Sequence, residues 1–216
     1  TDGFRDGELV AISGPTKNGK TLLAQTLTVN FVKQGQMPLW FSFEVPPRQF
    51  LSQFPDLPIF FMPRKLKPYA LDWVFDRMDE ARIKHGCRIV FIDHLHFLFD
   101  MARVRNTSIE IGTVIRQLKS KAVADGLVIF LLCHTSKISK DEDLTYEKIR
   151  DSSFVAQESD TVFLVKRDLK KGENRASLRV EFHRRTGVLE RKVELAKING
   201  YLVEVTEPNE RSKNNG

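Results

Sequence analysis

Short apolar runs alternate with longer segments whose apolar residues recur at helical spacing through much of the chain. A continuous apolar run is typical of a strand buried on both faces, and helical spacing is typical of an amphipathic helix. We expect strands at 8–13, 38–43, 57–62, 88–92 and 127–133, and helices from residue 21 onward, at 69–84 and at 109–124. The apolar face of the helix at 69–84 is expected to comprise Leu71, Val74, Phe75, Met78 and Ile83. This alternation predicts an α/β fold with a mostly parallel central sheet flanked by helices.

The carboxy-terminal part of the chain carries further apolar runs, which we interpret as antiparallel strands added to the parallel sheet. These strands are expected at 161–166, 176–182, 192–195 and 201–205. With 216 residues the chain suffices for one α/β core, so we assign 1–206 to a single domain and predict a disordered tail at 207–216. Because the first strand begins so close to Thr1, we expect the domain to be part of a longer protein.

A glycine-containing segment lies between the first predicted strand and the first predicted helix. Gly14 and Gly19 let the backbone bend so that successive N–H groups, with the positive end of the helix, point at phosphate oxygens. Lys20 can reach the β- and γ-phosphates of a nucleotide, and the Thr21 hydroxyl can ligate the accompanying Mg²⁺. An ordinary turn with two glycines would not explain Lys20 followed by Thr21. We therefore predict an ATP- and Mg²⁺-binding phosphate loop formed by Gly14, Pro15, Thr16, Lys17, Asn18, Gly19, Lys20 and Thr21.

Polar residues directly follow three of the predicted strands, at the edge where open α/β sheets bind ligands. Asp93 closes an uninterrupted apolar run and is placed to hold Mg²⁺ through water opposite the phosphate loop. Glu44 is placed to orient and deprotonate an attacking water molecule. His134 could donate a hydrogen bond to the γ-phosphate. The alternatives are a strand-capping Asp, a surface Glu and a structural His.

A His-x-His pair follows Asp93. His94 and His96 would share one face if the strand continued, as zinc ligands can. No third ligand lies within reach along the sequence, and Asp93 is already assigned to Mg²⁺. We therefore favour a structural role for the two imidazoles over a zinc site.

Composition sets the remaining limits. The chain has 34 Lys and Arg against 28 Asp and Glu, a formal charge of +6, which favours a polyanionic partner such as a nucleotide or nucleic acid. Cys87 and Cys133 lie beside or within apolar runs, where reduced buried thiols are expected rather than a disulfide framework. No apolar stretch approaches the roughly 20 residues of a membrane span, and no signal-peptide pattern begins the chain. We expect a soluble protein without a membrane partner in a reducing compartment, the cytoplasm or nucleoid, with mitochondrial and viral origins left open.

With these motifs, the chain resembles the RecA-like motor domain of ring-shaped replicative helicases, the family of bacterial DnaB, the phage primase-helicases and Twinkle. His134 matches a position that carries His in the Twinkle and phage branch and Gln in DnaB, which implies a role as phosphate sensor. The resemblance covers most of the chain and is carried by the segments 1–9, 39–44, 89–97, 115–119, 150–153, 157–160 and 183–187.

The segment 183–187, His-Arg-Arg-Thr-Gly, is similar to the family's Lys-x-Arg-x-Gly element. This resemblance implies that Arg185 is an arginine finger acting on the nucleotide of a neighbouring subunit. His183 stands where the family usually has Lys, and Arg184 would take the role if the register shifted by one. The stretch between Glu44 and residue 57 is also shorter than in relatives.

The resemblance implies an ATP-dependent replicative DNA helicase motor, a homohexamer that hydrolyses ATP with Mg²⁺ at its subunit interfaces and translocates on single-stranded DNA. Its catalytic residues would be Lys20, Glu44 and Arg185. A primase or helicase loader would be a further partner. Two basic loops would line the bore, with Arg103, Arg105, Lys137 and Lys140 as candidate DNA contacts.

Two alternatives remain open at this stage. A recombination ATPase of the RecA or RadA type would form filaments on DNA instead of rings. A non-motor module with a RecA-like fold would bind nucleotide without moving DNA. The single Glu44, followed by Val45, and the Arg185 element favour the helicase branch.

Overall fold

The computed structural model describes residues 2–100, 102, 105–134 and 152–205 of the chain. Within these residues one eight-stranded sheet has the order β2-β3-β4-β1-β5-β6-β7-β8. Its strands are β1 (Leu9–Gly14), β2 (Leu39–Ser42), β3 (Ile89–Asp93), β4 (Val128–His134), β5 (Thr161–Arg167), β6 (Arg175–His183), β7 (Val188–Ile198) and β8 (Tyr201–Glu204). The strands from β2 to β5 in this order pair in parallel, and β6, β7 and β8 continue the sheet antiparallel. The predicted α/β architecture with added antiparallel strands is confirmed.

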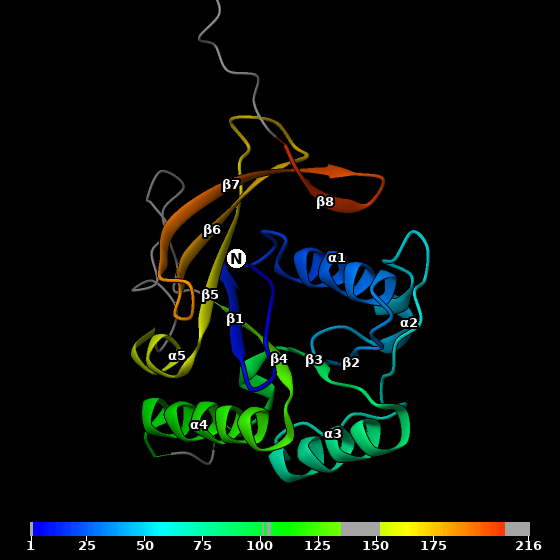
Figure 1. Ribbon diagram of the computed structural model, residues 1–216, viewed down its shortest axis with the longest axis vertical. Helices are drawn as coiled ribbons and strands as arrows, with labels where there is room; N and C mark the ends of the chain where they lie inside the picture. The colour runs from blue at the N-terminus through cyan, green and yellow to red at the C-terminus, as the bar shows by residue number, and fades with distance from the viewer. Residues whose placement is uncertain (1, 101, 103–104, 135–151, 206–216) are drawn as a thin grey trace, which may run out of the picture.

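Helices cover both faces of this sheet, as Figure 1 shows. They are α1 (Lys20–Lys33), α2 (Pro47–Leu51), α3 (Leu71–His85), α4 (Thr107–Asp125) and α5 (Ser152–Glu158), with a short 3₁₀ helix, η1 (Leu95–Phe97), after β3. On one face α3, α4 and α5 contribute Val74, Ile115 and Val155 to an apolar cluster. On the other face α1 and α2 contribute Leu23 and Phe50 to a second cluster. The β7–β8 hairpin arches above α1 (Figure 1).

The alternation of side chains along β1 explains why its sequence is continuously apolar. Leu9 and Ala11 enter the cluster under α3 and α4, whereas Val10 and Ile12 enter the cluster under α1. All four side chains are fully buried. A strand buried on both faces has no position for a polar side chain, so its sequence lacks the alternation of a half-exposed strand.

Aromatic rings fix α1 against the sheet. Trp40, Phe91 and Phe130 stack across β2, β3 and β4, with centroid distances of 4.7 and 4.6 Å. The indole N–H of Trp40 donates a 2.8 Å hydrogen bond to the Thr28 hydroxyl of α1. This hydrogen bond satisfies the buried indole N–H. It also ties α1, the helix that follows the phosphate loop, to the rings on the sheet.

The predicted strand at 57–62 is wrong. In this segment only Phe61 forms a bridge, to Leu39 of β2, through hydrogen bonds that join Trp40 N–H to the Phe61 carbonyl and Phe61 N–H to the Pro38 carbonyl. Pro58 has no N–H to donate to a ladder, and Ile59 is 70% exposed. The apolar run therefore meets the edge of the sheet at Phe61 alone and does not form a strand.

The expected helices exist, with different ends and one misplaced apolar residue. The helix predicted at 69–84 is α3, and Val74 and Met78 are buried as expected. Ile83, assigned to the same face, is 74% exposed. Ala81 takes the corresponding buried position, because it lies three residues after Met78 on the same side of the helix.

Other predicted boundaries are wrong where charged residues form part of a strand. The strand predicted at 192–195 is the longer β7, whose middle residues are largely exposed and include Arg191 and Lys192. The helices α2 and α5 and the 3₁₀ helix η1 were not predicted at all. These three elements are short, so they carry too few turns for a periodic pattern.

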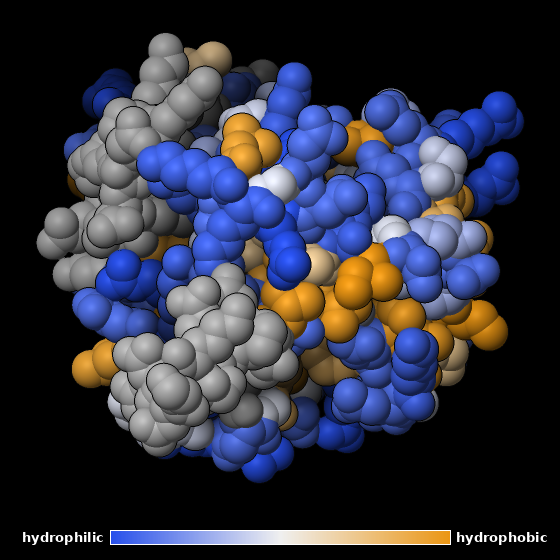
Figure 2. Space-filling view, turned by 90° about the horizontal axis from the view of Figure 1, so that it is seen from above, coloured by the Kyte–Doolittle hydropathy of each residue, from blue (hydrophilic) through white to orange (hydrophobic). Residues whose placement is uncertain are grey.

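Several large hydrophobic side chains remain at the surface of the described residues. Leu57, Ile83 and Leu189 are 58%, 74% and 71% exposed. Seen from above, the surface is mainly hydrophilic with a band of hydrophobic residues near its middle (Figure 2). Exposed apolar groups of this kind are available for contacts with other chains.

Cys87 and Cys133 are both buried, and both are free thiols. Burial raises the pKa of Cys87 to about 11 and that of Cys133 to about 12. Within the part of the chain that the structure describes, no helix has both the length and the apolar character that a bilayer crossing demands.

Candidate nucleotide-binding site

The predicted phosphate loop joins the end of β1 to the start of α1. Gly19 precedes α1 with a φ of 96°, a left-handed conformation that favours glycine. Gly14 is required by close approach, because a Cβ built on it would collide with the carbonyl oxygen of Val165 in β5. The Asn18 side chain accepts a 2.9 Å hydrogen bond from the Arg167 N–H and so ties the loop to the end of β5. Both contacts are to β5, so the loop is held against that strand in the absence of a ligand.

Lys20 is the central cation of this loop. Its side chain is buried, and Nζ donates hydrogen bonds to the carbonyls of Gly14 at 2.9 Å and Pro15 at 3.1 Å. Burial lowers the pKa of Lys20, while the charges of Asp93 and Glu44 oppose this effect. A buried ammonium bound only to carbonyls is electrostatically undercompensated, so a phosphate anion at the loop would stabilise it.

Thr21 and Asp93, the two residues predicted to hold Mg²⁺, are in direct contact. The Thr21 hydroxyl donates a 2.8 Å hydrogen bond to Oδ2 of Asp93. Asp93 is 1% exposed, and its Oδ1 has no hydrogen-bond partner among the described residues. Burial raises the pKa of Asp93 to about 6, assisted by Glu44 and opposed by Thr21 and Lys20. A buried, incompletely satisfied carboxylate beside a hydroxyl and a phosphate loop fits Mg²⁺, which prefers oxygen ligands.

Glu44 and His134 meet at the same edge, as predicted, and His94 joins them. Glu44 Oε2 lies 3.3 Å from His94 Nδ1 and 3.9 Å from His134 Nε2. The Glu44 side chain is 40% exposed, whereas those of His94 and His134 are 12% and 19% exposed. Burial, with smaller contributions from His134, His96 and Lys20, lowers the pKa of His94 to about 3, so its imidazole is neutral. The Glu44 carboxylate is thus exposed to the cleft on one side and contacts the two imidazole rings on the other.

A cleft of about 680 Å³ lies at the phosphate loop and is lined by Lys20, Thr21, Glu44 and His134. Asp93 and His94 lie behind this lining, in contact with Thr21 and Glu44 respectively. One wall is the segment 52–55, and the other includes Lys197 and Gly200 of the β7–β8 hairpin. Gln25 of α1 donates a 3.0 Å hydrogen bond to Gln53, which secures the first wall. The cleft has the size of a typical small-ligand site, which is large enough for a nucleotide.

The second wall is tied to α1 and to the chain beyond Phe54. The Leu202 N–H donates a 3.0 Å hydrogen bond to the Thr26 hydroxyl. The Tyr201 hydroxyl donates a 3.2 Å hydrogen bond to the Asp56 carbonyl. The antiparallel extension of the sheet therefore completes the nucleotide cleft.

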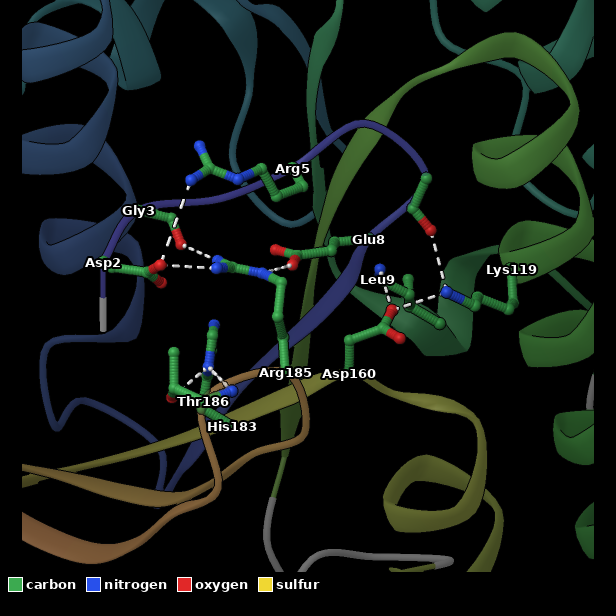
Figure 3. A network of polar contacts seen from close by, with 11 residues as sticks. Asp2, Gly3, Arg5, Glu8, Leu9, Lys119, Asp160, His183, Arg185 and Thr186 are labelled. Atoms are coloured by element: carbon green, nitrogen blue, oxygen red, sulfur yellow. Dashed lines mark hydrogen bonds and ion pairs between the residues drawn. The ribbon is translucent and has the colours of Figure 1, made fainter.

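Arg185 lies at the opposite end of the sheet, in the turn between β6 and β7 (Figure 3). Its Nε donates to Glu8 at 3.0 Å, Nη1 donates to Asp2 at 2.6 Å, and Nη2 donates to the Gly3 carbonyl at 2.9 Å. Glu8 precedes β1, while the phosphate loop follows the far end of β1. The length of that six-residue strand, roughly 20 Å, separates Arg185 from its own nucleotide cleft.

The two residues before Arg185 are also held within the chain. His183, which stands at the family's Lys position, is 1% exposed; its Nδ1 accepts a 3.2 Å hydrogen bond from the Thr186 N–H and lies 2.6 Å from the Thr186 hydroxyl. Arg184, the alternative finger, donates to the carbonyls of Ala156 and Gln157 at the end of α5. The His183 imidazole is therefore turned inward, whereas Arg184 and Arg185 are both exposed.

The predicted DNA-contacting residues are only partly covered by the structure. Arg105 is exposed and directly precedes Asn106, whose side chain accepts a 3.2 Å hydrogen bond from Ile109 N–H at the start of α4. Arg103, Lys137 and Lys140 lie outside the described residues.

Sequence reasoning missed the wall residues 52–55, Lys197 and Gly200 of the cleft. It also missed the approach of His94 to Glu44 and His134. The chain does not continue as a strand after Asp93, because η1 follows, so His94 and His96 do not act as a pair on one strand face. The direct succession of Asp93 and His94 was the one available signal for His94.

A phosphate loop at the carboxyl edge of a parallel sheet, with a buried Asp and an exposed Glu at the ends of neighbouring strands, is typical of a RecA-like nucleotide-binding domain. The chain belongs to the family described as the DnaB-like helicase C terminal domain, whose model matches residues 48–198. This match includes Asp93, His134 and Arg185, and it begins after the phosphate loop and Glu44.

Two solved structures share the fold. One, described as a DnaB-like replicative helicase and its interactions with primase, has a TM-score of 0.83 and 19% identity over 94% of this chain. This chain spans 59% of the length of that protein. The other, described as an ATPase domain, has a TM-score of 0.80 and 19% identity, covering 94% of this chain and 87% of the other. Both likenesses cover 94% of the chain and so confirm the RecA-like fold for nearly its whole length.

Proposed function

We propose that this domain is the ATP-hydrolysing motor of a ring-shaped replicative DNA helicase. The observation that carries the proposal is the division of catalytic groups between two ends of the sheet. Lys20, Thr21, Glu44 and His134 line one cleft, and Asp93 contacts Thr21 there. Arg185 contacts Glu8 (Figure 3), which precedes β1, whereas the phosphate loop follows β1. A site that lacks its own arginine finger is completed by a neighbouring subunit.

Within one subunit, Lys20 binds the β- and γ-phosphates, and Thr21 with Asp93 holds Mg²⁺. When bound, Mg²⁺ supplies positive charge that offsets the charge building on the phosphate oxygens. Glu44 orients the attacking water and accepts its proton, since its carboxylate is exposed to the cleft. His134 contacts the γ-phosphate, because it ends β4 next to β1 and the phosphate loop.

Between subunits, Arg185 stabilises the charge on a γ-phosphate bound by the adjacent protomer. We propose a homohexamer, in which each interface contains one cleft and one Arg185. Single-stranded DNA passes through the bore, and the segments 101–107 and 135–150 contact its backbone through Arg103, Arg105, Lys137 and Lys140. A net charge of +6 supports a polyanionic partner of this kind.

The full helicase would also bind a primase or a loader protein. The similar DnaB-like helicase is described together with its interactions with primase. A reducing compartment, the cytoplasm or nucleoid, suits two buried thiols that remain free.

A mixing experiment tests the division of catalytic groups. Lys20→Ala removes the phosphate contact but keeps the finger, and Arg185→Ala keeps the phosphate loop but removes the finger. Each variant alone should lack DNA-stimulated ATP hydrolysis. In randomly mixed rings about a quarter of the interfaces would pair an intact cleft with an intact finger, so the mixture should recover activity up to about that fraction.

The control is a mixture of Lys20→Ala with Glu44→Gln, which leaves no interface with a complete cleft and should stay inactive. No recovery in the first mixture, with rings visible in electron micrographs, would contradict a site completed between subunits. Filaments instead of rings on single-stranded DNA would favour the recombination class. Hydrolysis indifferent to DNA would favour a non-motor module.

A further inference from the structure

The carboxyl ends of three adjacent strands bring together a carboxylate and two imidazoles. Glu44 follows β2, His94 follows β3, and His134 ends β4. These strands are direct neighbours in the sheet, and β2 pairs with β3 up to Ser42 opposite Asp93. The three side chains therefore converge because the parallel strands end at one edge, although they are far apart in the sequence.

We propose that Glu44, His94 and His134 form a binding site for a transition-metal ion of the zinc class, separate from the magnesium pair. One potential ligand atom from each residue lies within 4.8 Å of the others. This site goes beyond the proposed motor function, because metal binding here needs neither nucleotide nor DNA.

The spacing of the ligand atoms suits a small tetrahedral ion. Zinc–nitrogen and zinc–oxygen bonds of about 2.0–2.2 Å place neighbouring tetrahedral ligands roughly 3.3–3.5 Å apart. The separation of Glu44 Oε2 from His94 Nδ1 is already 3.3 Å, and its separation from His134 Nε2 is 3.9 Å. The two imidazole rings stand at 77° with centroids 4.3 Å apart. Small rotations of Glu44 and His134 would bring all three atoms onto one ion.

The type of ligand distinguishes this site from the magnesium site. Two imidazoles and one carboxylate match the three-ligand zinc sites that leave a fourth position for water. Mg²⁺ prefers oxygen ligands, which Thr21 and Asp93 offer nearby. The structure therefore places a nitrogen-rich set and an oxygen-rich set side by side at the carboxyl edge of the sheet.

Burial also favours a ligand at His94. Nδ1 of His94 is buried and makes no hydrogen bond to another described residue, while it points at Glu44. The positive charge of Lys20 in the same cleft opposes a cation, but that ammonium is directed to the Gly14 and Pro15 carbonyls. The carboxylates of Glu44 and Asp93 supply compensating negative charge.

An ion at this site would occupy the groups that the motor requires. Glu44 could not accept a proton from water while its carboxylate holds a metal, and His134 could not contact the γ-phosphate. The phosphate loop would stay unchanged. Zinc should therefore inhibit hydrolysis without preventing nucleotide binding, a consequence that rests on the proposed function.

The direct test is a titration of the nucleotide-free chain with Co²⁺ in excess Mg²⁺, followed by the visible absorption of four-coordinate cobalt. We expect one equivalent to bind, with displacement by Zn²⁺. His94→Phe keeps an aromatic ring against Phe97, which lies 4.9 Å away, and removes both nitrogens. It should weaken binding by roughly tenfold or more. The matched variant His96→Phe, outside the cluster, should leave binding unchanged.

Glu44→Gln provides a second variant, because Glu44 is exposed and its replacement does not disturb the core. It should also weaken Co²⁺ binding. Circular dichroism of each variant establishes that it is folded. Absence of a four-coordinate cobalt spectrum in the parent chain, or binding that is unaffected by both His94→Phe and Glu44→Gln, would overturn the proposal.

The test separates this site from the motor function. Stoichiometric cobalt binding in a chain without ATPase activity would support the metal site and contradict the proposed motor function. ATPase activity in a chain that binds no cobalt would support the motor function and contradict the metal site. With both present, micromolar-range Zn²⁺ should stop hydrolysis in the parent chain, chelator should restore it, and a fluorescent nucleotide should remain bound throughout.

Discussion

Arg185 donates its Nε–H to Glu8 at 3.0 Å, so the proposed finger is held by its own chain. Glu8 is buried and its Oε2 has no hydrogen-bond partner among the described residues. Arg185 therefore has a structural task in addition to any task at a neighbouring subunit: it compensates a carboxylate that the fold has removed from water.

Arg185→Ala should destabilise the domain, because it leaves the Glu8 carboxylate buried without its cation. Replacing Glu8 by Gln in the same chain should recover most of the lost stability but none of the ATPase activity. Urea unfolding of the two single variants and the double variant measures this coupling. Arg5→Ala is the control, since Arg5 contacts Asp2 only at 3.9 Å with both side chains exposed, and it should have little effect. Additive losses in the double variant would contradict the coupling.

Asp93→Asn should stabilise the metal-free protein at neutral pH while it abolishes hydrolysis. Burial raises the folded-state pKa of Asp93 from 3.8 to about 6. The folded state therefore binds the proton more tightly than the unfolded state, so this contribution to stability is complete below the unfolded pKa and is lost as the pH rises through 6. The pKa shift of Asp93 corresponds to a gain in unfolding free energy of at most about 3 kcal/mol for the variant. The loss of the attraction between Lys20 and the carboxylate reduces this gain.

The measurement is thermal unfolding in chelator between pH 5 and 8. The advantage of Asp93→Asn should grow with pH and level off above the folded pKa. Thr21→Val tests the neighbouring group, because it removes the hydrogen bond that lowers the pKa of Asp93 and should move the transition upward in pH. A constant difference across this pH range would show that Asp93 does not titrate as described.

The parallel half of the fold and the floor of the site were predictable because they depend on local signals. β1 reads as a continuous apolar run because both of its faces are covered, and the phosphate loop has a fixed spacing of Gly14, Gly19 and Lys20. Asp93 and Glu44 could be placed because parallel strands end at one edge of the sheet.

The remaining features depend on contacts that no local pattern reports. The run at 57–62 is as apolar as a strand, yet Pro58 and the lack of a partner leave Ile59 exposed. The cleft wall at Gly200 comes from a hairpin distant in sequence from the phosphate loop. His94 entered the site because β2 and β4 flank β3, a fact of strand order. Each of these required the tertiary arrangement.

Gly200→Ala should weaken nucleotide binding through the cleft wall. Gly200 has a φ of 84° in the β7–β8 turn, and a Cβ there would collide with Pro55 on the opposite wall. Gly187 has a φ of 68° in the β6–β7 turn, and a Cβ there would meet nothing within 4 Å. Both Ala variants should lose about 1 kcal/mol from the left-handed backbone, but only Gly200→Ala should reduce affinity for a fluorescent ATP analogue.

The comparison isolates the contact with Pro55, since the two substitutions share the backbone strain. Equal nucleotide affinities for Gly200→Ala and Gly187→Ala would show that the β7–β8 hairpin does not contribute to nucleotide binding. Pro55→Ala in the Gly200→Ala chain should restore part of the affinity, because it vacates the space that the new methyl group enters.

Gly112→Ala should reverse the usual effect of replacing a helical glycine. Alanine in the middle of α4 would gain about 1 kcal/mol of helix propensity. A Cβ at this position would lie 2.7 Å from Phe154 Cδ1 on α5, however, and the ring cannot withdraw as a flexible chain end would. We expect a net loss of about 1–2 kcal/mol from overpacking, measured by the urea midpoint. In a Phe154→Ala background the obstacle is gone, so the same Gly112→Ala change should stabilise the domain. Only the contact between Gly112 and Phe154 predicts that the effect of Gly112→Ala on stability changes sign between the two backgrounds. A stabilising effect in both would show that the packing of α4 against α5 does not need glycine at this position.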